Sequence, residues 1–323
     1  MYDIASDAWI GWAPETGAIT DAADNSTATL PALPNFTIVG YNKLPAGKRG
    51  LNNTKAFTAA LAGAAYTKKG NVAPEISFEF CAGALGLLAY CVRASEDAAL
   101  PYVCIYEGVY GGWTNVYRFA KCSTLAIAIQ LAAQSNEITI NAAFWAIART
   151  ALTTPPLATR SLLRALGTPL MAHDLRQFQI TNSAGVTADY RKGATNVSYN
   201  VDNKLERINQ RNNWGEDHAL SRTCYEIREH TIVAGGEMGF NRKLSETLFT
   251  GAKNAQDWGD IKAIISDGPA LPAGGTPKAM TLTATGCTPG DESGQGGDAD
   301  TTLNWTVPFS ANNLLLELPQ PEA

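Results

Sequence analysis

The sequence predicts a mainly β protein made of two tandem β-barrel or β-sandwich domains, each with one short packed α-helix. Three observations lead to this expectation. Many short segments alternate apolar and polar residues, turns rich in Gly, Asn and Pro separate them, and 323 residues is long for one hydrophobic core. The hydrophobic fraction of 45% is large enough to fill two cores.

The stretch 116–149 is the centre of the predicted fold. Large apolar residues alternate with small or polar ones in two arms that flank a polar turn at 134–137, as expected of a β-hairpin. Two strands alone are unstable, so this hairpin needs more sheet and a second layer to cover it. Its predicted central residues are Leu125, Ile127, Ile129, Ile138, Ile140 and Phe144.

The remainder of the first half predicts further strands and one helix. Strands are expected at 35–41, 72–80 and 102–110, and a short buried helix within 81–92. The segment 42–55 is rich in Gly, Asn, Lys and Arg, so we expect a long projecting loop there.

A proline-rich segment at 153–170 predicts the domain boundary, which gives domains at 1–155 and 156–323. The second half repeats the plan of the first. A second long polar loop is expected at 202–222, and a strand at 226–240 runs into an amphipathic helix that begins near Arg242. The two strand-to-helix junctions, near Cys81 and Arg242, lie 161 positions apart, which suggests duplication of one unit.

Charge and hydropathy exclude several functional classes. A net charge of −5 disfavours binding of nucleic acid through its phosphates. The longest apolar run, 81–92, is shorter than the roughly 20 residues that a membrane-spanning helix needs. Since the N-terminus has no signal-peptide pattern, we expect folding in a reducing cytoplasm, with the six scattered cysteines as buried free thiols.

No pattern in the chain predicts an enzyme, a cofactor or a metal site. His173, His218 and His230 lack metal-ligand spacing, and the nucleotide-binding and nucleophile-elbow motifs are absent. Glu75 and Glu79 share one strand face, as glycosidase carboxylates do, yet a solvated sheet face explains them better. The acidic loop 291–300 matches no established calcium loop, so we interpret it as a surface loop.

Taken in order, the motifs of this chain resemble those of the tail tube (major tail) proteins of bacteriophages with long, non-contractile tails, the siphophages. The opening 6–20, with its Glu-Thr and Gly turn, the basic loop 42–55 and the strand and helix of 74–92 each resemble a family segment. The Asp-Asn-x-Leu-Glu segment within 197–209 does so too. The nearest match is a Gly-Gly turn, an aromatic-Arg strand and a Ser-x-Leu hairpin, here formed by Gly111, Gly112, Tyr117, Arg118, Ser123 and Leu125.

This resemblance implies a structural virion protein with tail-tube barrels. Such subunits form stacked rings whose inner sheets join edge to edge, and double-stranded DNA passes through the lumen without specific binding during genome ejection. The implied partners are further copies of the chain, a tape-measure protein and tail-terminator or tip proteins. With two barrels per chain, we expect a ring of three copies with pseudo-sixfold shape.

We further expect the polar loops to make contacts between stacked rings. The residues chosen for this hypothesis are Lys43, Lys48, Arg49, Lys55, Lys204, Arg207, Arg211 and Trp214. One alternative is a second domain that decorates the outside of a ring of six chains. Another is a carbohydrate-binding or adhesin-like double β-sandwich, which the seven tryptophans at 9, 12, 113, 145, 214, 258 and 305 would serve by stacking on sugars. A β-rich hydrolase lacks a recognisable pair of nucleophile and base.

Overall fold

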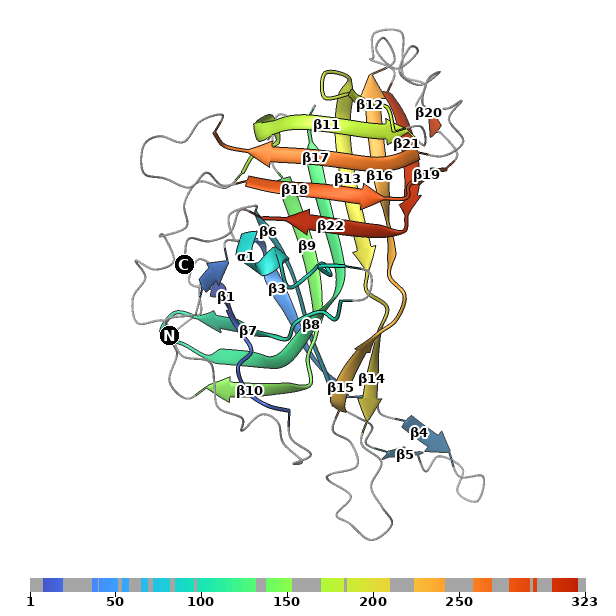
Figure 1. Ribbon diagram of the computed structural model, residues 1–323. Helices are drawn as coiled ribbons and strands as arrows, with labels where there is room; N and C mark the ends of the chain where they lie inside the picture. The colour runs from blue at the N-terminus through green and yellow to red at the C-terminus, as the bar shows by residue number, and fades with distance from the viewer. Residues whose placement is uncertain are drawn as a thin grey trace.

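The computed structural model describes most of the chain. The described residues are 8–19, 37–39, 41–51, 54–57, 65–68, 72–81, 85–95, 98–131, 138–152, 170–182, 185–209, 224–241, 258–268, 279–290, 293–294 and 304–318. Over these ranges the fold is mainly β, every strand pairing is antiparallel, and the α-helix α1 spans Leu85–Leu88. Figure 1 shows the arrangement of these elements.

A strongly bent strand, β8 (Thr114–Gln130), organises the first half. Its beginning pairs with β7 and β10, and its end pairs with β9, so one strand belongs to two layers. The other strands of this half are β1 (Ala8–Pro14), β2 (Thr37–Val39), β3 (Tyr41–Leu51), β4 (Thr54–Phe57), β5 (Ala65–Lys68), β6 (Val72–Cys81), β7 (Val103–Val109), β9 (Ile138–Trp145) and β10 (Ala148–Leu152).

The second half continues the large sheet and adds a second one. After a 3-10 turn at Ala172–Asp174, its strands are β11 (Leu175–Asn182), β12 (Thr187–Asp189), β13 (Ala194–Asp202), β14 (Leu205–Asn209), β15 (Cys224–Glu229), β16 (Val233–Asn241), β17 (Trp258–Ser266), β18 (Ala279–Thr285), β19 (Thr288–Pro289), β20 (Ser293–Gly294), β21 (Asn304–Ala311) and β22 (Asn313–Glu317).

Strands β8 and β13 join the two halves. They pair antiparallel from Asn196 opposite Gln130 to Asp202 opposite Thr124. The strands therefore follow one another in the order β3, β6, β9, β8, β13, β16, β21, with β19 and β20 beyond β21. The predicted boundary at 155/156 lies outside the described residues, and the division into two domains stays a prediction.

The five-stranded sheet β12, β11, β17, β18, β22 covers the second half of the large sheet, and its strands run across β13 and β16 (Figure 1). The apolar residues between the layers come from both halves. Ile127, Tyr199 and Met238 of the large sheet and Phe178 and Leu282 of the five-stranded sheet are fully buried in one core cluster. Burial of this apolar surface supplies most of the driving force for folding.

The two halves repeat one pairing order. In the first half β2, β1, β7, β8 and β10 are successive neighbours, and in the second half β12, β11, β17, β18 and β22 are. The inner strands β3, β6, β9 and the end of β8 have their counterparts in β13, β16, β21 and the short β19. Strand β16 begins at Val233, 161 positions after β6 begins at Val72.

The predicted hairpin is present as β8 and β9, with Ile127 opposite Ile140 and Ile129 opposite Ile138. Leu125 and Phe144 are buried as well. The predicted turn at 134–137, the segment 153–169 and the helix expected after Arg242 lie outside the described residues.

Three predictions of local structure are wrong. The segment 41–51 is the strand β3 rather than a loop, because β6 pairs with its backbone despite its Gly and Pro. The predicted loop 202–222 begins with the strand β14, which pairs with β15, and 226–240 is two strands separated near His230. By contrast, the short buried helix predicted within 81–92 is present as α1, whose Leu87 and Leu88 are buried.

A buried ion pair fixes the N-terminal segment to β8. The Glu15 carboxylate accepts hydrogen bonds from Arg118 Nε at 3.0 Å and Nη2 at 2.8 Å, from Cys104 Sγ at 2.8 Å and from the Phe119 amide at 3.2 Å. The side chains of Glu15 and Arg118 are 1% and 0% exposed. Burial alone would raise the pKa of Glu15, but the hydrogen bonds from Arg118, Cys104 and Gly17 outweigh it, and the pKa lies below its usual 4.5.

We predict that Arg118→Met lowers the free energy of unfolding by roughly 3–5 kcal/mol, because it leaves a buried carboxylate without its cation. Urea unfolding at neutral pH measures the change. Because the pKa of Glu15 is depressed in the folded state, the wild-type pair stabilises the fold above about pH 4.5 and loses this effect as the pH falls further. Arg228→Met, which removes an exposed pair with Glu226, is the control and should cost less than about 1 kcal/mol. Equal losses in both variants would contradict this account.

Candidate functional site

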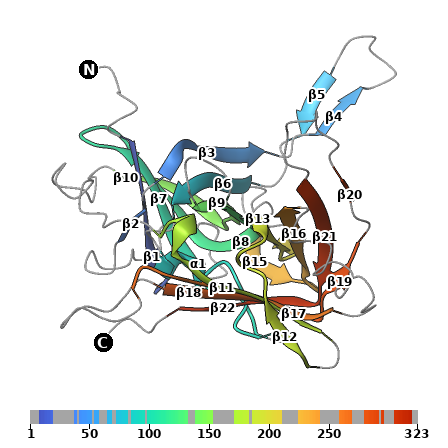
Figure 2. The same ribbon diagram turned by 90° about the horizontal axis from the view of Figure 1, so that it is seen from above.

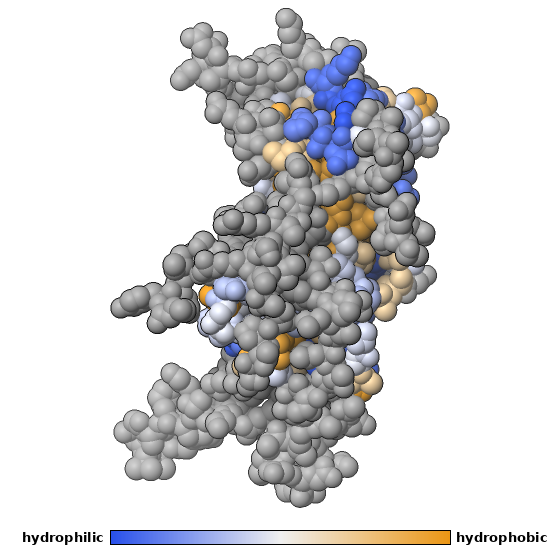
Figure 3. All heavy atoms as spheres, turned by 90° about the vertical axis from the view of Figure 1, so that its left-hand side faces the viewer, coloured by the Kyte–Doolittle hydropathy of each residue, from blue (hydrophilic) through white to orange (hydrophobic). Residues whose placement is uncertain are grey.

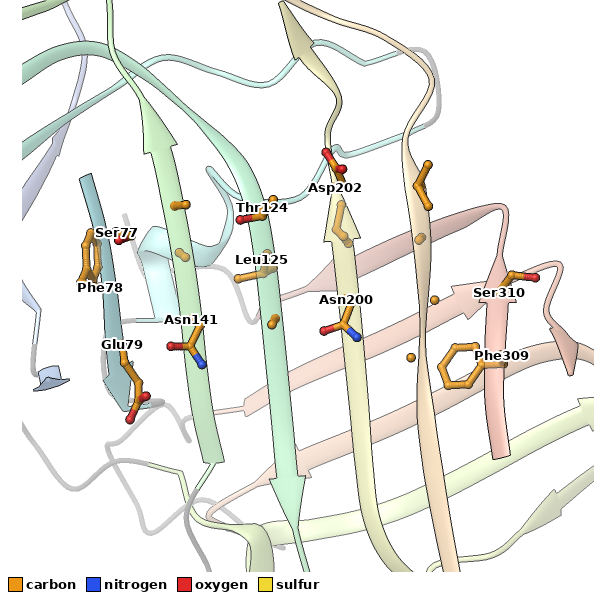
Figure 4. A pocket seen from close by; sticks show the side chains of 18 residues that line it. Ser77, Phe78, Glu79, Thr124, Leu125, Asn141, Asn200, Asp202, Phe309 and Ser310 are labelled. Atoms are coloured by element: carbon orange, nitrogen blue, oxygen red, sulfur yellow. The ribbon is translucent and has the colours of Figure 1, made fainter. Parts of the chain in front are cut away.

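The large sheet is curved, and its concave face is the most distinctive surface of the described structure. Viewed from above, β3, β6, β9, β8, β13, β16 and β21 follow an arc, with α1 and the five-stranded sheet on the convex side (Figure 2). A groove of about 740 Å³ lies on the opposite face of these strands. We call this face the concave wall; its lining includes Ser77, Glu79, Thr124, Ala126, Asn141, Ala143, Asn200, Asp202, Val233, Gly235 and Ser310 (Figure 4).

The strand pleat explains the composition of the concave wall. Successive side chains point to opposite faces, so the large apolar residues of each strand enter the core and the residues between them face outward. On β8, for example, Leu125 and Ile127 are buried while Thr124 is exposed. The outward residues are mostly small or polar.

The groove lining contains two acidic residues, Glu79 and Asp202, and no Lys, Arg or His. Glu237, which is exposed, adds a third carboxylate farther along β16. Asp202 forms an ion pair with Lys204 at 2.6 Å, at the end of the wall. The described wall is therefore neutral to acidic.

Gly236 permits the close packing of β16 in this wall. A Cβ atom at this position would overlap the carbonyl oxygen of Ser198 on β13 and lie 2.8 Å from the ring of Phe309 on β21. A larger residue would separate the strands, which the continuous hydrogen bonding from β13 to β21 does not allow.

Asn203 locks the junction between the halves. It is fully buried, its amide side chain donates to the carbonyl oxygens of Cys91 at 3.1 Å and Cys122 at 3.0 Å, and its backbone N–H donates to Ser123. Lys204 then adopts a positive φ of 46°, which turns the chain out of β13 into β14. The Asp-Asn-x-Leu-Glu motif is thus one of the points where the second half is attached to the first.

The ribbon formed by β14 and β15 is clamped onto the first half by ionic and aromatic contacts. Lys121 Nζ forms an ion pair with Glu229 at 2.6 Å, donates to the carbonyl of Ile227 and lies 4.3 Å from the centre of the Tyr102 ring. Arg207 donates to the carbonyl of Pro74 at 2.8 Å and lies 4.4 Å from the centre of the Trp145 ring. These contacts hold the two halves together at one end of the sheet.

Both end strands of the concave sheet have an edge without a partner among the described residues. Strand β3 pairs with β6, and β19 and β20 pair with β21, but no described strand lies beyond them. The unpaired backbone groups of such edges are ready to bind another strand.

The structure places the residues predicted for ring stacking in different surroundings. Lys43, Lys48 and Arg49 belong to β3 and Lys55 belongs to β4, whereas Arg211 and Trp214 lie outside the described residues. Lys204 and Arg207 both make contacts within the chain, with Asp202 and with Glu75 at 3.3 Å. The role of this set between rings stays a prediction.

The remaining candidate groups of the sequence are dispersed. Among the described residues, no group of three or more His, Cys, Asp or Glu side chains is arranged to hold a metal ion. His230 lies beside Glu206, and Cys91, Cys104, Cys122 and Cys287 are buried free thiols as predicted. On the face seen in Figure 3, hydrophilic residues form a patch in the upper part of the molecule, at the level of the five-stranded sheet in Figure 1.

The tryptophans do not form a sugar-binding platform in the described part of the chain. Trp9 is fully buried, Trp12 packs on Tyr90, and Trp145 lies beneath Arg207. Trp113 is 44% exposed on the turn before β8, and the groove lining contains no tryptophan.

A scan against models of known protein families finds no match to this chain, and a search of curated proteins finds no similar sequence either. In the described residues, no helix has the length and apolar character needed to cross a membrane.

We predict that Asn203→Ala destabilises the fold by about 2–4 kcal/mol, because it leaves the buried carbonyls of Cys91 and Cys122 without a donor. Thermal and urea unfolding measure the effect. Asn200→Ala on the exposed side of β13 is the matched control and should change stability by less than about 0.5 kcal/mol. A loss at Asn203 no greater than the loss at Asn200 would show that the junction does not depend on this side chain.

Proposed function

We propose that this chain is the tail tube protein of a long, non-contractile bacteriophage tail, which polymerises into stacked rings around a DNA channel. One observation carries the proposal. A single curved sheet runs through both halves of the chain, its groove lining consists largely of small residues and contains no basic residue, and neither of its end strands has an outer partner among the described strands. A sheet of this kind is completed by closing into a barrel, which removes its edges. Several copies joined side by side would form such a barrel.

The repeated pairing order supports two tandem units of tail-tube type. In this interpretation the β8–β13 pairing joins two units within one chain, and an equivalent pairing joins the end of one chain to the start of the next. Because each chain supplies two units, three copies replace six single-unit subunits in a ring. Covalent linkage makes half of the joints intramolecular and lowers the entropy lost on assembly.

The concave wall suits a conduit for DNA. A surface without basic residues does not hold phosphates, so DNA passes along it without being retained. Short side chains also leave the lumen free of projections. No catalytic group, cofactor or metal is needed for this role.

The alternative of a carbohydrate-binding double sandwich gains less support from these residues. Sugar sites commonly present an exposed aromatic face, and the groove lining offers only the buried rings of Phe78 and Phe309. A sugar-binding site would not account for the repeated strand order or for the open strand edges. Assembly is therefore the property to test first.

We expect the purified protein to form rings or tubes with a central channel in negative-stain electron microscopy, with three chains in each ring. Subunit counting in a reconstruction, or native mass spectrometry of single rings, determines the number. Six chains per ring with the second half facing outward would overturn the tandem arrangement. Discrete monomers at every concentration and salt condition would overturn the proposed function itself.

We also predict that Asn141→Lys combined with Asn200→Lys converts the wall into a DNA-retaining surface. Both side chains are exposed in the groove, so folding should be unaffected, while each added cation strengthens contact with phosphate. In filter-binding assays, assembled tubes of this variant should retain more double-stranded DNA than wild-type tubes. This retention should decrease steeply as the salt concentration increases. The pair Asn141→Gln and Asn200→Gln should bind no more DNA than the wild type. Strong DNA retention by wild-type tubes would contradict the conduit account.

A further inference from the structure

Strand β8 turns a corner at Phe119. It pairs with β10 as far as Arg118 and with β9 from Lys121 onward. Phe119 has a positive φ of 49°, a conformation that a bulky residue rarely adopts. The Ile147 amide closes the corner by donating to the carbonyl of Arg118 at 3.1 Å. We call this place the first corner.

The second half turns an equivalent corner at Gly286, which we call the second corner. The chain pairs with β22 as far as Thr285 and with β21 from Thr288 onward. Gly286 has a positive φ of 60°, and the Asn312 amide donates to the carbonyl of Thr285 at 2.9 Å. Pairing register and hydrogen bonding therefore match position by position. The matched residues are Phe119 with Gly286, Lys121 with Thr288, Trp145 with Ser310 and Ile147 with Asn312.

The β14–β15 ribbon of the second half covers the first corner. Phe119 and Ile147 form a buried cluster with Ile227 of β15, and Leu205 of β14 packs against this cluster. Lys121 donates to the carbonyl of Ile227 at 3.1 Å. Under this cover, Phe119, Lys121 and Ile147 are only 1%, 6% and 2% exposed.

The second corner is open to solvent. Its four matched residues are all exposed: Gly286, Thr288, Ser310 and Asn312. Each also has a smaller side chain than its counterpart at the first corner, so a covering strand could approach the backbone closely there. Within one chain, the second corner therefore lacks the cover that the first corner has.

The repeat identifies the element that corresponds to the covering ribbon. Strands β14 and β15 lie between β13 and β16 in the chain, as β4 and β5 lie between β3 and β6. The two enclosing strand pairs shift register at the same place, between the partners of Phe80 and Glu79 and between those of Phe240 and Gly239. The β4–β5 hairpin is thus the counterpart of the ribbon in the first half. It projects away from the sheets of its own chain (Figure 1, Figure 2).

We propose that the β4–β5 hairpin of one copy covers the second corner of the copy to which its β3 edge is joined. Within the chain, β13 pairs with the end of β8, and the ribbon that continues from β13 covers the corner of that same strand. Pairing of β3 with β19 of a second copy brings the hairpin to the second corner in the same way. The inference rests on the proposed assembly and adds to it an interaction surface outside the paired edges.

This contact gives the joint a function that the edges alone do not supply. Strand edges offer backbone groups that any other strand can bind, and a paired edge can slip in register. A slip would move the hairpin off the second corner. The hairpin therefore fixes both the partner and the register of the joint.

Photo-cross-linking in assembled protein tests the contact. The photoreactive residue p-benzoylphenylalanine replaces the exposed Ser310, and tubes assembled from an equal mixture of isotope-labelled and unlabelled chains are irradiated. Mass spectrometry should identify cross-links from position 310 to residues 54–68, including cross-links between labelled and unlabelled chains. The same photoreactive residue in place of Lys192, which is exposed after β12, should give no cross-link to 54–68.

A substitution at the second corner measures what the contact contributes. Ser310→Arg fills the space that the hairpin takes, so the protein concentration needed for assembly should rise at least about tenfold. Thr187→Arg is the matched control, because Thr187 and Ser310 are both exposed strand residues whose hydroxyl groups form one hydrogen bond to a neighbouring strand. The control should change this concentration by less than about twofold. Circular dichroism and thermal unfolding verify that both variants fold.

The outcomes separate this inference from the proposed function. Normal tubes in which position 310 cross-links only to other segments would overturn the inference and leave the proposed function standing. Cross-links to 54–68 confined to single chains would do the same, since the hairpin would then cover its own corner. An assembly concentration no higher for Ser310→Arg than for Thr187→Arg would also count against the contact. Failure of the wild type to assemble under any condition would overturn the proposed function and this inference together.

Discussion

Strand β8 pairs with strands of two different layers, and the rest of the structure depends on this double pairing. Its first half pairs with β7 and β10, its second half pairs with β9 and β13, and the pairing with β9 shifts register between Cys122 and Thr124. Such a bulge bends a strand and increases its twist. Without the bend, the inner sheet could not continue into β13 while the outer strands cover the core.

Several buried polar groups of β8 lie close to the bend. Each of them has a partner in another part of the chain. Arg118 meets Glu15, Lys121 meets Glu229, and the carbonyl of Cys122 accepts from Asn203. Removing water from charges is costly, and a well-packed apolar core would be at least as stable. These contacts therefore contribute more to fixing which segments meet than to net stability. They also explain why the Glu-Thr turn, the aromatic-Arg strand and the Asp-Asn-x-Leu-Glu segment stand out in the sequence.

Period-2 alternation made the hairpin and the strands at 72–80 and 102–110 predictable, because it reflects the two faces of a pleated sheet. Leu125, Ile127 and Ile140 were identifiable as core residues for this reason alone. The strand β3 was not, because its Gly, Pro, Lys and Arg content is typical of a loop and its pairing with β6 is a long-range contact. Sequence patterns could not predict the β8–β13 pairing, the concave wall or the open edges for the same reason. These features depend on which strands become neighbours, and local patterns do not encode that.

The composition of the concave wall follows from the two different environments of the large sheet. A sheet with one face on the core and the other in water places its large apolar residues on the core side, which leaves mostly small or polar residues on the wall of β9, β8 and β13. That arrangement leaves the edges as the reactive part of the sheet, since no described strand pairs with the outer backbone groups of β3 or of β19 and β20.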